Sequence, residues 1–105
     1  MADGTHINMS TAVNGDEAVV RLRGDLDLDG AGPVAETLVK LGEGAVRHVV
    51  VDASEVTFLD SSGLRALLSA REQLDKVDVV LRVDSPSPAV ERVLEMTGTR
   101  QLLGA

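Results

Sequence analysis

Residues 46–52 read Val-Arg-His-Val-Val-Val-Asp, an almost continuous β-branched run that lacks the polar alternation of a half-exposed strand. Such runs are typical of parallel sheets, in which crossover helices cover both faces of a strand. The run therefore predicts an interior strand covered on both sides, and it restricts the fold to helices packed on a sheet. A chain of 105 residues has room for one such domain, which we expect to span residues 1–105.

Other strand patterns surround this run. Residues 18–23 alternate, with the apolar side chains on one face and two arginines on the other, and residues 7–13 before Asn14-Gly15 form a hairpin partner. Residues 78–83 form a further apolar strand. The chain therefore contains an N-terminal hairpin and two later strands.

Helical patterns separate the strands. Apolar residues recur at helical spacing over residues 34–41 and 64–74. A third helix begins with Ser87 as N-cap and Pro88 at its first position and ends at Gly98, after which residues 102–103 are expected to pack on the core. This order predicts an α/β domain with a mixed, mostly parallel sheet, an N-terminal hairpin and right-handed, packed crossover helices.

The segment 58–65, Phe-Leu-Asp-Ser-Ser-Gly-Leu-Arg, lies where a strand pattern changes to a helix pattern. It places Asp60, Ser61 and Ser62 at the N-terminus of that helix, where free N–H groups and a partial positive charge favour an added phosphate. Ser61 is therefore a candidate phosphorylation site. The alternative is a plain helix cap, because Asp and Ser are both preferred N-cap residues.

Charge and composition exclude several kinds of partner. A net charge of −7 disfavours nucleic acid, and a single aromatic residue provides no platform on which bases could stack. The absence of cysteine fits a reducing compartment. We find no signal peptide pattern and no apolar stretch of roughly 20 residues. These features predict a cytoplasmic protein with a protein partner, no membrane contact and a monomeric free form.

Residues 25–30, Asp-Leu-Asp-Leu-Asp-Gly, followed by Glu36, match the calcium-loop pattern D-x-D-x-D-G-x5-E. A small calcium-binding module using Asp25, Asp27, Asp29 and Glu36 is therefore an alternative. The context argues against it, because an EF-hand loop follows a helix whereas the preceding residues alternate as a strand. We expect an acidic connection between strand and helix, and no metal.

Catalysis is not expected. Ser61 with a distant histidine could form a triad on paper, but a nucleophile elbow requires G-x-S-x-G and Leu59 stands at the first glycine position. Neither His6 nor His48 has a sequence neighbour that would complete a ligand pair. The sequence therefore predicts a protein that is not an enzyme and carries no cofactor.

Three segments in order, residues 24–27 (Gly-Asp-Leu-Asp), 58–64 and 87–98, together resemble the STAS domain of bacterial anti-sigma factor antagonists. The likeness extends from the first hairpin to the tail. It implies that Ser61, directly after the aspartate of the D-S-S-G motif, is the phosphoacceptor. It also implies that Gly24 and Asp27 lie beside Ser61, on a partner-binding surface that we expect Asp60, Ser62 and Gly63 to complete.

The resemblance further implies a partner-switching role in transcription. The unphosphorylated antagonist would bind an anti-sigma factor with serine kinase activity and release a sigma factor, whereas the phosphorylated form could not bind. A metal-dependent phosphatase of the PPM type would remove the phosphate. The alternative within the same family is a STAS scaffold that does not switch and serves in a stress-signalling complex.

Overall fold

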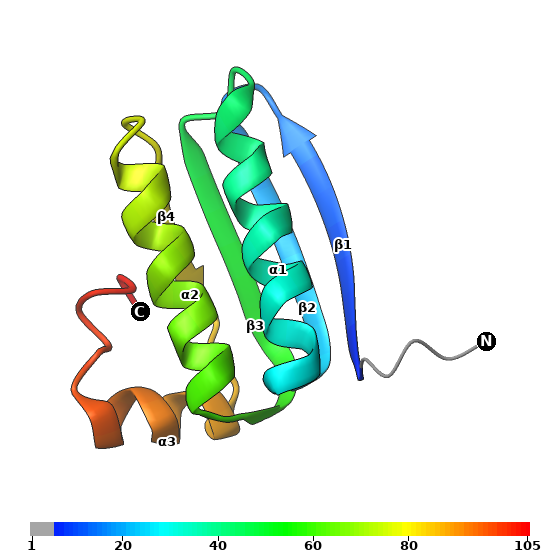
Figure 1. Cartoon of the computed structure of the whole chain (residues 1–105), viewed down its shortest axis with the longest axis vertical. Helices are drawn as coiled ribbons and strands as arrows, with labels where there is room; N and C mark the ends of the chain where they lie inside the picture. Colours follow the sequence, from blue (N-terminus) through cyan, green and yellow to red (C-terminus); the bar gives the residue numbers. More distant parts are fainter. Residues whose placement is uncertain (1–5) are drawn as a thin grey trace.

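The computed structural model describes residues 6–105. Within these residues, four strands and three α-helices begin with a hairpin of two strands and then alternate along the chain, as drawn in Figure 1. The strands are β1 (Ile7–Asn14), β2 (Glu17–Leu26), β3 (His48–Leu59) and β4 (Val80–Asp84). The helices are α1 (Leu28–Lys40), α2 (Ser61–Asp75) and α3 (Pro88–Thr97), and a short 3-10 helix (Leu41–Glu43) follows α1.

The sheet has the order β1-β2-β3-β4, with β1 antiparallel to β2 and the other neighbours parallel. The hairpin turns at Gly15, whose φ of +65° suits glycine. Helix α1 connects β2 to β3 and α2 connects β3 to β4. The mixed, mostly parallel sheet with an N-terminal hairpin and crossover helices is therefore confirmed.

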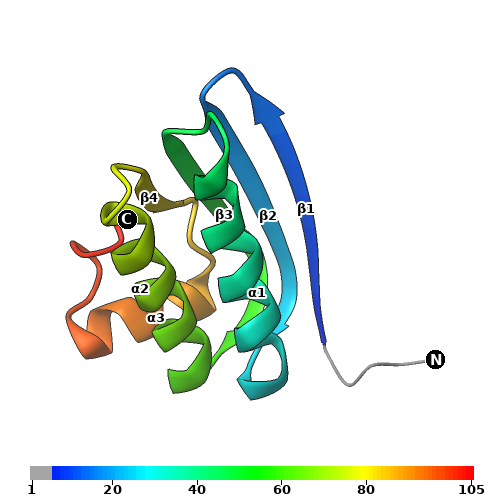
Figure 2. The same cartoon turned by 45° about the horizontal axis from the view of Figure 1, so that its top comes forward.

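Helices α1 and α2 lie side by side against one face of the sheet (Figures 1 and 2). Their apolar sides meet the inward residues of the strands, and the largest fully buried side chains include Leu22, Leu38 and Leu67. The valine-rich run lies in the interior strand β3, and Val49, Val50 and Val51 are all buried, so the expected coverage on both sides is confirmed there. Val50 points to the face opposite α1 and α2 and is 5% exposed, between its strand partners Val19 and Arg82.

The first helix begins earlier than the sequence pattern indicates. Strand β2 continues to Leu26 and α1 begins at Leu28, so Asp27 alone separates them and Pro33 lies inside the helix. The first turn of α1 packs closely on β1 at Gly30. A side chain at this position would not fit, because its Cβ would lie 2.7 Å from Cγ2 of Ile7. The expected acidic loop is therefore mostly regular structure.

Helix α3 has the ends that the sequence predicts, with Ser87 as N-cap, Pro88 in the first turn and Gly98 in the left-handed conformation. The Ser87 hydroxyl accepts from Val90 N at 3.2 Å and donates to Val56 O at 2.6 Å, which ties the helix to β3. In the tail, Leu103 is fully buried and its carbonyl accepts from Val83 N, whereas Leu102 is 47% exposed. The expectation that both leucines pack on the core therefore holds only for Leu103.

Asp52, on the sheet face opposite α1 and α2, gives a pH-dependent test of this fold. Its Oδ1 accepts from Ser54 N at 3.0 Å and from Ser54 Oγ at 2.8 Å, and its Oδ2 lies 3.4 Å from Arg21 Nε. These contacts, above all the backbone hydrogen bond from Ser54, hold the pKa of the Asp52 carboxyl below its usual 3.8. The stabilisation is therefore present above the ordinary pKa and is lost as the pH falls through the lowered one.

We expect Asp52→Asn to reduce the free energy of unfolding by about 1 kcal/mol at pH 7, because the carboxylate hydrogen bonds are weakened. The difference from wild type should shrink below about pH 4. Urea denaturation at pH 7 and pH 3 measures both. Glu55→Gln is the control, since Glu55 pairs only with Arg23 at the surface and should cost less than about 0.5 kcal/mol. A loss independent of pH for Asp52→Asn would contradict the assignment.

Candidate functional site

The carboxyl ends of β2 and β3 meet at one edge of the sheet. Leu26 pairs with Leu59 in the parallel register, and Asp60 N donates to Leu26 O at 3.4 Å. One residue later each chain segment enters a helix, α1 after Asp27 and α2 after Asp60. Two helix N-termini, each headed by an aspartate, therefore lie next to each other.

Both aspartates are N-caps with extended backbone. Asp27 Oδ1 accepts from Asp29 N at 3.1 Å and from Gly30 N at 3.3 Å. Asp60 Oδ1 accepts from Gly63 N at 2.9 Å. The capping role at α2 therefore belongs to Asp60, and Ser61 is the first helical residue instead of its cap.

Ser61 is exposed, and its hydroxyl has no hydrogen-bond partner among residues 6–105. Ser62 beside it is partly buried. The free N–H groups of this helix end and its partial positive charge favour an anion there. The geometry therefore presents a serine hydroxyl that is accessible, uncommitted and placed where an attached phosphate is tolerated.

Two of the glycines singled out in the sequence shape the backbone here. Gly63 is buried, and a Cβ on it would collide with Leu26 O and lie 2.7 Å from Cδ1 of Leu59. Gly24 has a φ of +105° at an irregularity in β2, and a Cβ there would collide with His6 O. The pairing of Leu26 with Leu59 therefore places Asp27 at the same sheet edge as Asp60, Ser61 and Ser62, and the two glycines allow the chain segments to approach closely there.

The calcium-loop pattern does not form a loop. Asp25 is still in β2, where its Oδ1 accepts from Thr57 Oγ1 at 2.8 Å, and Glu36 is exposed well inside α1. Within residues 6–105, the one group of three side chains with metal-ligand atoms within 4.8 Å is His6, Asp27 and Asp29. No sequence pattern predicts that His6 lies beside Asp27 and Asp29, because the pairing of β1 with β2 places it there.

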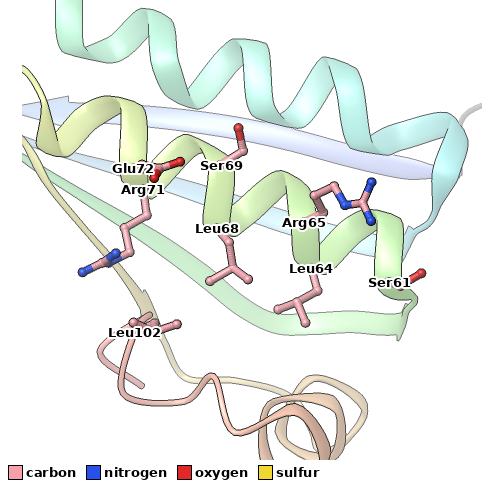
Figure 3. Close-up of a pocket in the computed structure, with 8 residues that line it drawn as sticks. All are labelled: Ser61, Leu64, Arg65, Leu68, Ser69, Arg71, Glu72 and Leu102. Carbon is pink, nitrogen blue, oxygen red and sulfur yellow. The ribbon is translucent and has the colours of Figure 1, made fainter.

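A groove of about 520 Å³ runs beside Ser61 between α2 and the C-terminal tail (Figure 3). Its lining includes Leu64, Leu68 and Leu102, with Arg65 and Arg71 as cations. A smaller groove of about 300 Å³ between α1 and α2 is lined by Ser62, Arg65 and mostly small residues. Neither Arg65 nor Leu102 was predicted to belong to the site, although the spacing of four residues between Ser61 and Arg65 is visible in the sequence.

The sequence profile described as "Mlab, STAS domain" matches residues 9–104. The chain belongs to the STAS domain family. An anti-sigma-B factor antagonist of Staphylococcus epidermidis is 26% identical over 98 residues, which cover 93% of this chain and 91% of the relative. The anti-sigma factor antagonists among its relatives agree with the sequence resemblance.

Solved STAS structures share the fold. An anti-sigma factor antagonist from Mycobacterium paratuberculosis is 26% identical with a TM-score of 0.80, covering 92% of this chain and 82% of that one. The antagonist SpoIIAA in its unphosphorylated form is 25% identical with a TM-score of 0.78, covering 90% and 84%. SpoIIAA of Bacillus in the phosphorylated form is 23% identical with a TM-score of 0.72, covering 91% and 87%, and shares the fold.

These relatives are named as antagonists of anti-sigma factors, not as enzymes. Across residues 6–105, none of the helices combines the length and the apolar character required to cross a bilayer.

Proposed function

We propose that this chain is an anti-sigma factor antagonist controlled by phosphorylation of Ser61. The unphosphorylated form binds an anti-sigma factor with serine kinase activity in the cytoplasm and thereby releases a sigma factor. The kinase transfers the γ-phosphoryl group of ATP to Ser61 Oγ, with loss of the hydroxyl proton and release of ADP. The phosphorylated form no longer binds, and a PPM-type phosphatase restores it.

The observation that carries the proposal is the state of the Ser61 hydroxyl. Asp60 caps α2, so the neighbouring serine is not needed for the cap and its exposed hydroxyl lacks a partner among the described residues. A serine that served as the cap would have its hydroxyl occupied by a backbone N–H. The names of the relatives support an anti-sigma factor as the partner.

The partner surface surrounds this serine. Asp27, Asp60 and Ser62 supply side chains at the two helix N-termini, while Gly24 and Gly63 set the backbone that brings them together. Such a surface needs no catalytic group or cofactor of its own, because the kinase and the phosphatase supply the chemistry. The protein then acts as a regulatory binding module, monomeric when free, without nucleic-acid or membrane contact.

A pull-down from the native bacterial lysate tests the proposal, with the wild-type protein and Ser61→Glu as baits and mass spectrometry as the readout. We expect an ATP-binding anti-sigma factor on the wild-type bait alone, and phosphate on Ser61 instead of Ser62 after incubation with ATP. Identical partners on both baits would favour the scaffold that does not switch, and phosphate on Ser62 would move the acceptor by one residue.

A further inference from the structure

Arg65 lies on α2 four residues after Ser61, and both side chains are exposed and line the same groove. In a helix, residues at positions i and i+4 are neighbours, with Cβ atoms about 5–6 Å apart. Helical side chains also lean toward the N-terminus, so the later residue reaches back to the earlier one. Figure 3 shows the Arg65 guanidinium extending toward the end of the helix where Ser61 lies.

The guanidinium of Arg65 is uncommitted within the described residues. The ion pairs there involve Arg21, Arg23 and Arg100, and none includes Arg65. The carboxylates of Asp60 and Asp27 do not pair with Arg65, because they accept hydrogen bonds from backbone N–H groups at the two helix starts. A cation is therefore free one helical turn after the serine.

We propose that Arg65 is the intramolecular partner of the phosphate on Ser61, an inference that rests on the proposed phosphorylation of that residue. An anion placed four residues before a cation is the favourable orientation of a helical ion pair. The planar guanidinium also matches phosphate oxygens with two parallel hydrogen bonds. Phosphorylation then changes the partner surface twice, because it adds negative charge and it occupies a free cation beside the groove.

The pKa of the phosphate itself provides the test. Phosphoserine is inserted at position 61 during translation into the full chain and into its Arg65→Gln and Arg71→Gln variants, and ³¹P NMR follows the titration. The second ionisation of free phosphoserine has a pKa of about 6. We expect this pKa to be lower in wild type than in Arg65→Gln by roughly 0.2–0.4 pH units, the shift that corresponds to an exposed helical ion pair.

Arg71→Gln is the matched control, because this substitution removes the same charge from the same groove. Arg71 lies ten residues after Ser61 on α2, so it is not a helical neighbour of that serine. The phosphate of this variant should titrate as in wild type, and Arg65→Lys should retain part of the shift. The other charged or titratable groups of the two helix starts and of the groove are identical in all variants and cancel in the comparison: His6, Asp27, Asp29, Asp60 and Glu72. Equal pKa values in all four proteins, or equal shifts in Arg65→Gln and Arg71→Gln, would overturn the proposal.

This experiment is independent of the partner, since neither a kinase nor an anti-sigma factor is present. A pull-down that recovers no anti-sigma kinase would reject the proposed function and leave the measured pairing of Arg65 intact. A normal pull-down with no shift in the Arg65→Gln titration would reject the pairing alone.

Discussion

Ser61→Glu is expected to lower the affinity for the anti-sigma factor by a hundredfold or more while the domain stays folded. The substitution adds one negative charge at the first residue of α2, directly after Asp60 and at the sheet edge where Asp27 heads the neighbouring helix. The fold should tolerate this charge, because a helix N-terminus favours an anion by about 0.3–1 kcal/mol. The effect is therefore expected at the surface that the partner covers.

The size of the effect follows from local electrostatics. Two unit charges about 5 Å apart near a protein surface interact by roughly 3 kcal/mol at an effective dielectric constant of 20. A partner carboxylate, or a tightly packed patch over Ser61, would meet repulsion and desolvation of that order. Each 1.4 kcal/mol is about tenfold in affinity, so a loss of two orders of magnitude results. A phosphate, with a charge of about −1.5 to −2, should act more strongly.

Titration calorimetry with the anti-sigma factor recovered in the pull-down measures the loss. Ser61→Ala should bind as wild type but accept no phosphate, and Ser10→Glu, which adds the same charge at an exposed position on β1, should also bind as wild type. Thermal unfolding of each variant separates a loss of binding from a loss of fold. If Ser61→Glu bound as tightly as wild type, the electrostatic account of the switch would be wrong.

Gly63→Ala is expected to destabilise the domain by about 1–3 kcal/mol, the usual cost of forcing a methyl group into a packed position. The added Cβ would collide with the carbonyl oxygen of Leu26 and crowd Leu59. That carbonyl belongs to β2 and accepts from Asp60 N, so it cannot move without disturbing the junction between sheet and helix. For a domain of this size the Tm should fall by roughly 5–20 °C.

Gly32→Ala is the matched control for Gly63→Ala. Gly32 also lies in a helix, but no atom stands within 4 Å of a Cβ built there, so the methyl group meets open space. Alanine is favoured over glycine in helices by roughly 0.5–1 kcal/mol, but the ring of Pro33 disfavours helical backbone at a preceding residue that carries a Cβ, so this variant should stay within about 1 kcal/mol of wild type. Thermal and urea unfolding of both variants checks the pair. Equal stability of the two would show that α2 does not approach β2 as closely as described.

Much of the local structure could be predicted because it depends on residues close in sequence. The alternation in residues 18–23 predicts which side of β2 is buried. The burial of Ala18, Val20 and Leu22 confirms this prediction. Ser87, Pro88 and Gly98 mark both ends of α3 through capping chemistry that acts within one turn. The change from strand to helix at residues 58–65 is equally local, and β3 ends and α2 begins where that motif predicts.

The same local patterns misled where distant segments compete. The helical spacing over residues 34–41 and the acidic residues before it predicted a connection between strand and helix, but the cap at Asp27 and the close packing of Gly30 on Ile7 start α1 at Leu28. Residues 46–52 predicted burial on both sides, which holds for Val50, but they did not indicate that α1 and α2 both pack on the opposite face of the sheet. Leu102 and Leu103 are equivalent in sequence, and only the path of the tail along β4 buries one of them.

The sequence by itself determined the elements, their order and a serine at the start of the second helix, because periodicity and capping are written in neighbouring residues. Only the tertiary structure decided that Asp27 and Asp60 head adjacent helices, since this follows from the pairing of Leu26 with Leu59, two residues 33 positions apart in the chain. It also decided that Asp60 is the cap and that the Ser61 hydroxyl is free among the described residues. Register between strands is set by burial across the whole domain, which no local pattern encodes.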